Sequence, residues 1–366
     1  MQASKSFPLN AWYAAAWIHE VSGRHILART VCNRKIALWR TSDGTAVALA
    51  DACWHRLLPL SMGRLEDDRI VCRYHGLAFD ATGRCTHIPS VAKISPSACV
   101  QAYPLIERHR FVWIWPGDPS LADPSLVPDM HWNDDPEWAG DGDTLFLACD
   151  YRLVIDNLLD LTHETYVHAT SIGHRAIVAA QPTTTHDDHS VTVTRWMMDI
   201  DAPPFWRAQL GKPGNVDRWQ VIHFMAPCTI VLDVGVALAG TGAREGDRSQ
   251  GVNNRVLNTI TPATDESCMY FWSLVRNYRV RDQSLTTRLR NANASIFEED
   301  RVVVEAQQRS ISALHGESMH NLNIDAGSVW ARRNIELMIE RESATEREPP
   351  EEQMRGTHRG AHLAGR

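Results

Sequence analysis

The first third of the chain alternates short apolar, β-branched runs with turn residues. Runs at 35–39 and 45–50 are separated by Gly, Asp and Ser, a composition typical of tight turns. A final aromatic run at 111–115 is followed by the sequence Pro-Gly-Asp, which ends a strand. The pattern predicts an all-β domain over residues 1–118.

The rest of the chain mixes helical and strand patterns. Residues 119–143 are rich in Pro, Asp and Trp without periodicity, which is typical of a surface connector. Apolar residues then recur at helical intervals over 151–168 and over 283–315. Strand-like runs lie between these helices, at 190–197, 220–224, 229–236, 256–260 and 269–275. Together the elements predict an α+β fold with an antiparallel sheet.

The C-terminal pattern predicts one more short helix and then a tail. The helix is expected over 334–341, where it closes a second domain of residues 119–341. Residues 342–366 are charged and nearly free of large apolar groups, so we expect them to be disordered.

Composition restricts the classes of function. The 366 residues exceed the size that one hydrophobic core usually fills, which agrees with two domains. A formal net charge of -7 argues against a nucleic-acid partner. No signal-peptide pattern is present and no run approaches the roughly 18 apolar residues of a membrane span, so a cytoplasmic protein without a membrane partner is expected. The eight scattered cysteines suit reduced thiols better than disulfides.

Two short motifs in the β domain each combine one thiol with one imidazole. Cys53 and His55 form a C-x-H motif, and sixteen residues separate His55 from the C-x-x-H motif of Cys72 and His75. A Rieske 2Fe-2S cluster needs this mixed pairing, because two Cys hold one iron and two His hold the other. Zinc is the alternative, but zinc sites usually group the thiols in one element and the imidazoles in another. The motifs therefore favour the cluster.

A second pair of histidines lies in the helical pattern of 151–168. His163 and His168 are five residues apart, so on an unbroken helix their side chains diverge by about 140°. Convergence on one metal requires a distortion such as a π-type turn, and two surface histidines are the alternative. A Rieske cluster in the same chain needs an electron acceptor, however. Two histidines and a carboxylate with open positions form the usual site for non-heme iron(II).

The carboxylate is expected on the later predicted helix, where three acids are adjacent. These are Glu298, Glu299 and Asp300. On a helical wheel Asp300 lies within about 60° of Ile296 and Val303, whereas Glu299 is displaced by about 100°. Periodicity favours Asp300 and leaves the other two acids open.

The cluster motifs resemble the Rieske domains of bacterial ring-hydroxylating and O-demethylating oxygenases. Trp54 and Arg73 replace a commoner Pro and Gly of that family, which changes the polarity around the cluster but not its ligands. Further segments extend the resemblance to the vanillate and dicamba demethylase group, at 10–13, 202–207, 217–220 and 323–327. The resemblance implies a helix-grip, START-like catalytic domain with a curved antiparallel sheet and helices.

The same resemblance implies a role for individual residues. The family's carboxylate ligand matches Asp300. The family's acid three residues before the first His ligand matches Asp160, which implies a bridge from the cluster of one subunit to the iron of its neighbour. Asn157 matches a position close to the iron. A head-to-tail homotrimer is implied, because the two metal sites of one subunit of the family lie far apart.

The implied activity is a monooxygenase reaction in the catabolism of aromatic hydrocarbons. One atom of O2 enters the methyl group of a methoxylated aromatic acid, and the resulting hemiacetal collapses to a phenol and formaldehyde. Electrons come from NADH through a separate reductase or ferredoxin, since the chain has no G-x-G-x-x-G fingerprint. Two alternatives stay open. One is a Rieske monooxygenase that hydroxylates a methyl group or demethylates another aromatic substrate, and the other is an iron-sulfur electron carrier.

Residues of the predicted sheet and its neighbouring segments are candidates for the substrate pocket. A polar anchor for a carboxylate or hydroxyl group is expected among His223, Arg207 and Asn291. The candidate aromatic walls are Phe205, Trp206, Tyr270 and Trp272, for which ordinary core packing is the alternative.

Overall fold

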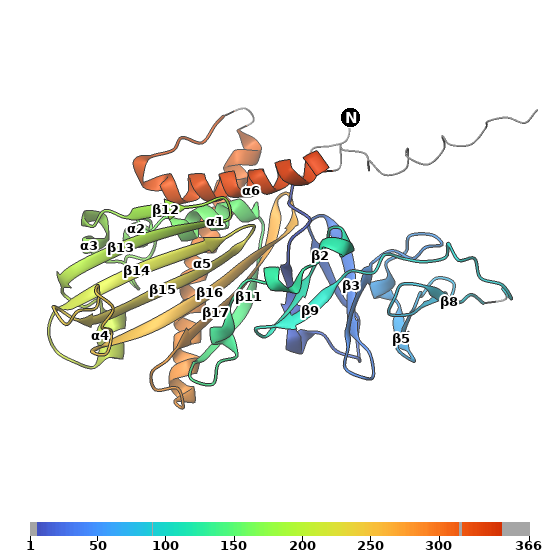
Figure 1. The fold of residues 1–366 in the computed structure, drawn as a ribbon, viewed down its shortest axis with the longest axis horizontal. Helices are drawn as coiled ribbons and strands as arrows, with labels where there is room; N and C mark the ends of the chain where they lie inside the picture. Colours follow the sequence, from blue (N-terminus) through green and yellow to red (C-terminus); the bar gives the residue numbers. More distant parts are fainter. Residues whose placement is uncertain (1–5, 90, 315–316, 346–366) are drawn as a thin grey trace, which may run out of the picture.

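The computed structural model describes residues 6–89, 91–314 and 317–345, which form two lobes (Figure 1). Within these ranges the N-terminal lobe contains strands and short 3-10 turns but no α-helix, and the C-terminal lobe combines a large antiparallel sheet with helices. The predicted α+β fold is therefore confirmed. No helix in these ranges is long and apolar enough to cross a membrane.

The N-terminal lobe is built from three small antiparallel sheets. The first contains β2 (Leu27–Val31), β3 (Arg34–Arg40) and β4 (Ala46–Ala50). The second contains β5 (Arg64–Glu66), β6 (Arg69–Val71), β7 (Ala78–Phe79) and β8 (Cys85–His87). The third has the order β1 (Tyr13–Trp17), β10 (Phe111–Ile114) and β9 (Leu105–Arg108). The strands expected at 35–39, 45–50 and 111–115 are all present.

Two hydrophobic cores stabilise this lobe, and one of them continues into the other lobe. A compact core around Trp39, Leu49 and Phe79 holds the strands next to the two Cys-His motifs. The third sheet instead packs on the C-terminal sheet, where the ring centroids of Trp17 and Phe111 lie 6.5 and 6.0 Å from that of Phe271. The backbone N–H of Cys32 also donates to Pro262 O at 2.8 Å. The lobes therefore share a core and are not joined by the connector alone.

The C-terminal sheet has seven strands that are paired throughout in antiparallel fashion. Its order is β11 (Ala139–Leu147), β17 (Ser267–Arg276), β16 (Gly251–Thr264), β15 (Thr229–Leu238), β14 (Val216–Met225), β13 (Ser190–Ile200) and β12 (Thr183–His186). The five predicted strands are confirmed as β13 to β17. Strand β11 overlaps the end of the connector predicted over 119–143. The prediction of an irregular connector is therefore wrong from residue 139 onward. Gly140 and Gly142 obscured this strand in the sequence, because glycine is uncommon in strands. Glycine is needed here because a Cβ at Gly142 would lie 2.0 Å from Trp272 O of β17.

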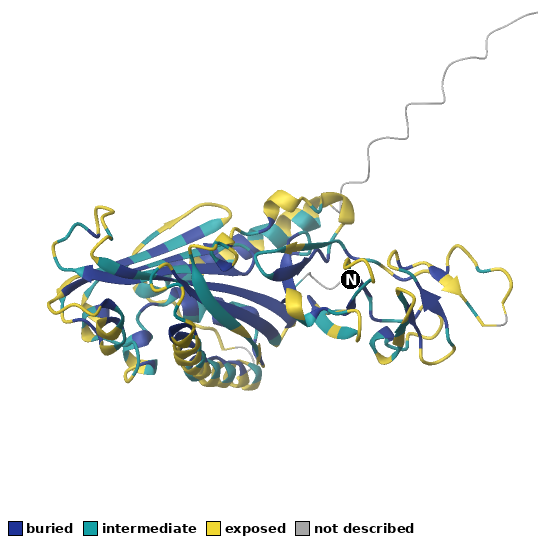
Figure 2. Ribbon diagram, turned by 90° about the horizontal axis from the view of Figure 1, so that it is seen from below, coloured by how far each residue is buried: buried dark blue, intermediate teal, exposed yellow. Residues whose placement is uncertain are grey.

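Helices cover one face and one edge of this sheet (Figure 1). They are α1 (Tyr151–Leu159), α2 (Glu164–Val167), α3 (Arg175–Ala179), α4 (Pro204–Leu210), α5 (Gln283–Ala313) and α6 (Ala326–Thr345). Short 3-10 turns join the elements: η1 (Ile18–Glu20), η2 (Leu60–Met62), η3 (Pro119–Leu121), η4 (Pro124–Leu126), η5 (His131–Asn133) and η6 (Asn323–Asp325). The sheet strands are mostly buried, whereas the outer side of α5 is exposed (Figure 2).

Two helix predictions require correction. The helix expected over 151–168 is two helices, because α1 ends at Leu159 and α2 begins at Glu164. The last helix starts at Ala326 and continues to Thr345, so residues 342–345 are helical and not part of a disordered tail. The Glu342 carboxylate accepts hydrogen bonds from the N–H groups of Leu9 and Asn10, which explains the extension. The remaining tail, 346–366, lies outside the described residues.

Candidate metal centres and substrate cavity

The two Cys-His motifs form neighbouring loops with the same backbone turn. In each loop the N–H of the fourth residue after the cysteine, Leu57 or Gly76, donates back to the cysteine carbonyl. Both residues have positive φ, 58° and 71°, which ends each turn sharply. The loops thereby present one thiol and one imidazole each, side by side.

The side chains of these loops separate into a buried thiol pair and an exposed imidazole pair. Cys53 and Cys72 are buried, and burial, aided by the neighbouring Cys72, raises the pKa of Cys53 to about 11. The Nδ1 atoms of His55 and His75 lie 3.2 Å apart at the exposed tip of the lobe. Two thiols on one side and two imidazoles on the other fit a two-iron cluster.

This arrangement does not fit a single zinc ion. Zinc bonds of about 2.0–2.3 Å would bring all four ligand atoms close to one another. In the described part of the chain, the only group of three or more His, Cys, Asp or Glu side chains with ligand atoms within 4.8 Å of one another is a different one. It consists of His163, His168 and Asp300.

The break between α1 and α2 brings the two histidines of this group together. His163 precedes the single turn of α2 and His168 follows it, so the turn from α1 reorients the first imidazole. Their Nε2 atoms lie 3.2 Å apart. The required distortion is therefore an interruption of the helix and not a π-type turn within it.

Asp300 of α5 completes the group, as periodicity favoured. Its Oδ1 atom lies 3.1 Å from His168 Nε2 and 3.4 Å from His163 Nε2. The helical wheel favoured this acid, but its neighbour Val303 is exposed, and the buried face of the helix continues through Val304. Two imidazoles and one carboxylate that leave other positions open fit non-heme iron(II).

Glu299 is the acid that contacts the group from outside. Its Oε2 lies 2.6 Å from Nδ1 of His168, the ring nitrogen that faces away from Asp300. An acceptor at this place holds a metal-binding imidazole in one orientation and increases its basicity. Sequence reasoning treated Glu299 only as a rival ligand and missed this role.

The charges of the group depend strongly on one another. Burial disfavours a charged imidazole, but the hydrogen bond and charge of Asp300 outweigh it and raise the pKa of His163 to about 9. The hydrogen bonds from both histidines hold the pKa of Asp300 well below its usual range, although burial opposes this. The site therefore binds protons that a divalent cation must displace.

Asn157 and Asp160 lie next to the group but contact it differently. Asn157 Nδ2 donates to Asp300 Oδ1 at 3.0 Å. The ring of His163 contacts the backbone carbonyl of Asp160, whereas the Asp160 carboxylate accepts from Thr162 N at 2.7 Å. Within one chain the carboxylate of Asp160 therefore positions the loop between α1 and α2.

A cavity of about 80 Å³ lies beside the group, between the sheet and α5. Its walls are largely apolar, and its polar members are Glu164, Arg218, Gln220, Asn254 and Asn293. Phe205 and Trp206, two of the candidate aromatic walls, line it. Glu164 directly follows His163, and Phe297 of the wall lies one turn before Asp300, so the cavity adjoins the metal ligands.

The other predicted pocket residues lie outside this lining. Tyr270 and Trp272 pack behind Phe297, with ring centroids 5.0 and 5.2 Å away. His223 is three residues from Gln220 on β14 and so points to the opposite face of the sheet. Arg207 is paired with Asp201, and Asn291 is exposed on α5. None of these three polar side chains lines the cavity, so their proposed role as an anchor stays a prediction.

Gln220, Arg218, Asn293 and Glu164 are the polar lining residues that sequence reasoning missed. Glu164 receives hydrogen bonds from Arg218 Nη2 at 3.2 Å and from Gln220 Nε2. Strand alternation within 216–225 would have shown that Arg218 and Gln220 share one face. No sequence signal identified that face as the one next to the metal.

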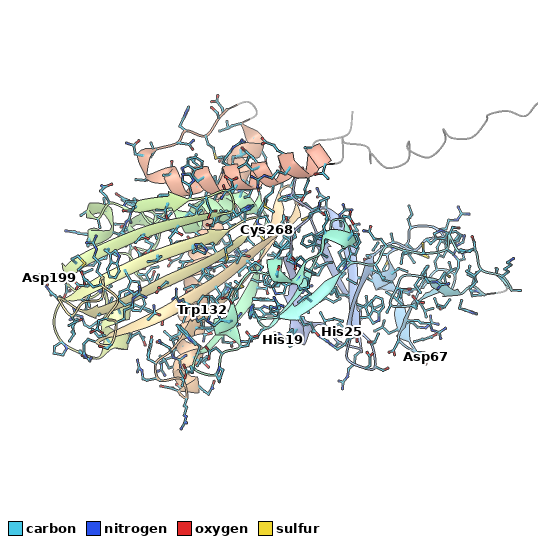
Figure 3. All side chains as sticks on the ribbon, viewed as in Figure 1. His19, His25, Asp67, Trp132, Asp199 and Cys268 are labelled. Carbon is cyan, nitrogen blue, oxygen red and sulfur yellow. The ribbon has the colours of Figure 1, made fainter. Side chains whose placement is uncertain are left out.

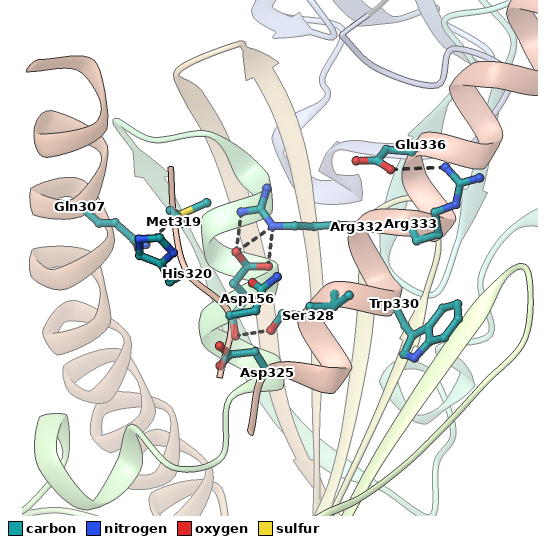
Figure 4. A pocket seen from close by; sticks show the side chains of 12 residues that line it. Asp156, Gln307, Met319, His320, Asp325, Ser328, Trp330, Arg332, Arg333 and Glu336 are labelled. Carbon is teal, nitrogen blue, oxygen red and sulfur yellow. Dashed lines mark hydrogen bonds and ion pairs between the residues drawn. The ribbon is translucent and has the colours of Figure 1, made fainter. Parts of the chain in front are cut away.

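A larger hollow of about 920 Å³ lies on the outer side of α1 (Figure 4). Its side chains neutralise one another, with Arg332 paired to Asp156 and Arg333 to Glu336. Asp156 precedes Asn157 and points away from Asp300, because consecutive helical side chains diverge by about 100°. This hollow is therefore separate from the metal ligands.

Two protein-family descriptions match the chain. The Rieske [2Fe-2S] domain matches residues 11–104, and the vanillate O-demethylase oxygenase C-terminal domain matches residues 147–341. The chain is similar to a vanillate O-demethylase oxygenase subunit of Pseudomonas sp. (strain HR199 / DSM 7063), with 42% identity over 92% of this chain and 97% of that one.

Two further proteins are similar over nearly the whole length. A putative toluene-4-sulfonate monooxygenase system iron-sulfur subunit of Comamonas testosteroni is 39% identical over 91% of this chain and 97% of its own. The crystal structure of dicamba monooxygenase bound to dicamba superimposes with a TM-score of 0.84 at 34% identity, over 92% of this chain and 99% of that one.

Proposed function

Because this chain belongs to the vanillate O-demethylase oxygenase family of Rieske proteins, we propose that it O-demethylates a methoxylated aromatic acid of the vanillate type. The observation that carries the proposal is the His163, His168 and Asp300 group beside a largely apolar cavity. Its apolar walls suit the faces of an aromatic ring and keep bulk water from the reacting methyl group.

Two metal groups are assigned to the two donor sets. Cys53, Cys72, His55 and His75 would hold the 2Fe-2S cluster, and His163, His168 and Asp300 would hold iron(II). Bound iron(II) supplies the activation of dioxygen. Glu299 orients His168, and Asn157 donates to Asp300, so that both ligands keep their place.

The overall reaction consumes one O2, two electrons and two protons for each methyl group. One oxygen atom enters a C–H bond of the methoxy group and the other leaves as water. In the resulting hemiacetal, the bond between the former methyl carbon and the aryl oxygen breaks, and the hydroxyl proton moves to the aryl oxygen. A phenol and formaldehyde are released. NADH supplies the electrons through a separate reductase or ferredoxin.

We also propose a head-to-tail homotrimer in which Asp160 connects the cluster of one subunit with the iron of the next. β5 lies next to the cluster motifs and α2 next to the iron ligands, and the two elements lie toward opposite ends of the molecule (Figure 1). Asp67 of the β5–β6 turn and Asp199 of β13 mark these two ends (Figure 3). Large apolar side chains are exposed near both sites, which supports an interface there. Near the cluster they are Trp54, Leu57 and Tyr74, and near the iron site Tyr166, Val302 and Val303.

The proposal is tested with the metal-loaded protein, a competent reductase, NADH and O2. Vanillate should yield one formaldehyde for each NADH oxidised in coupled turnover. Absence of formaldehyde from vanillate and from other methoxybenzoates would refute O-demethylation. Similarity to the toluene-4-sulfonate protein supports hydroxylation of an aryl methyl group as a second candidate. Formation of a benzylic alcohol from 4-toluenesulfonate, without formaldehyde from vanillate, would establish it.

A further inference from the structure

The cavity beside the metal ligands contains buried polar atoms that have no hydrogen-bond partner among the described residues. They are Asn293 Nδ2, Gln220 Oε1 and Arg218 Nε, and each belongs to a residue that lines the cavity. These residues are 7%, 1% and 3% exposed. A buried polar atom without a hydrogen bond costs free energy, so such atoms indicate the groups that a ligand satisfies.

Asn293 is placed to contact the ring of a substrate whose methyl group lies at the metal. It precedes Asp300 by seven residues on α5, which puts both side chains on the same helix face about 10 Å apart along the axis. Phe297 lies between them and lines the same cavity. A single aromatic ring with its methoxy group directed at Asp300 brings a further ring substituent toward Asn293.

The charge of the lining favours an uncharged substituent. Glu164 and Arg218 are the only charged residues among the described residues that line the cavity, and they are paired with each other at 3.2 Å. The charge of Arg218 is therefore already balanced by Glu164, and a carboxylate inside the cavity would meet only a cation that is shared with that acid. Burial of an uncompensated carboxylate is costly, whereas a hydroxyl can be satisfied by an amide.

From these observations, and resting on the proposed function, we propose that Asn293 is the specificity-determining residue for the substrate. Its side-chain N–H donates to an uncharged ring hydroxyl held inside the cavity, and the polar wall of Gln220 and Arg218 faces it. The carboxylate of an aromatic acid is not the group that this cavity recognises.

Three ligands distinguish the contribution of the ring hydroxyl to binding from that of the carboxylate. Vanillate differs from 3-methoxybenzoate by the hydroxyl alone and from 2-methoxyphenol by the carboxylate alone. Their binding to the metal-loaded protein is measured by calorimetry without O2 or reductase, so that turnover plays no part. In the wild type the hydroxyl should strengthen binding about tenfold and the carboxylate less than threefold.

Asn293→Leu should remove the gain from the hydroxyl and leave the small effect of the carboxylate unchanged. Asn291→Leu, an exposed position on the same helix, should preserve both. If the carboxylate provides the larger gain, or if Asn293→Leu weakens all three ligands equally, the inference is overturned. If none of the three binds the wild type, the proposed function fails together with it.

Discussion

Glu299→Gln tests whether Glu299 orients His168 or binds the metal directly. The change keeps the size of the side chain but removes the negative charge 2.6 Å from His168 Nδ1. The amide oxygen of Gln can still accept from the ring, but His168 is only 1% exposed, so water cannot easily replace the lost charge. Loss of such a partner typically weakens metal binding by about 10–100-fold, or about 1.4–2.7 kcal/mol. Asp300→Asn should weaken it further, because a charged ligand is lost.

Iron(II) affinity is measured by competition with a chelator under anaerobic conditions, with circular dichroism as a check on folding. Glu298→Gln is the matched control, since Glu298 is paired with Arg301 on the exposed side of the same helix. That variant should bind iron like the wild type. An affinity loss below twofold for Glu299→Gln, or an equal loss for Glu298→Gln, would refute the reasoning.

Three further predictions follow from the same contacts. Asp160→Asn should keep iron and cluster at wild-type levels, by metal analysis and absorbance, while turnover falls by at least about tenfold; unchanged turnover would dismiss the proposed bridge. Because the metal-free group raises the pKa of His163 to about 9, iron(II) affinity should increase up to about tenfold per pH unit between pH 6.5 and 8.5; a flat profile would contradict this proton competition. Gly142→Ala should lower the free energy of unfolding by about 1–3 kcal/mol in a urea titration, because the new Cβ would clash with Trp272 O. A loss below about 0.5 kcal/mol, which is roughly the scatter of surface substitutions, would show that β11 can shift to relieve the clash.

The sequence by itself determined the donor sets and the class of fold. The mixed pairing of Cys53 with His55 and of Cys72 with His75 depends on residue type and short spacing, which are local properties. Strand and helix periodicity likewise identified β13 to β17 and α5, because burial on one face imposes a repeat on the chain. Asp300 was favoured by the same repeat.

Only the tertiary structure decided how these pieces meet. The interruption between α1 and α2, which lets His163 and His168 converge, has no sequence repeat of its own. Which faces of separate elements pack together decides the contact of Glu299 with His168 and the direction of His223. It also decides that Asn293 Nδ2 has no partner among the described residues. Contacts between residues more than a hundred positions apart, such as Asn157 with Asp300, are set by packing of the whole core and not by local pattern.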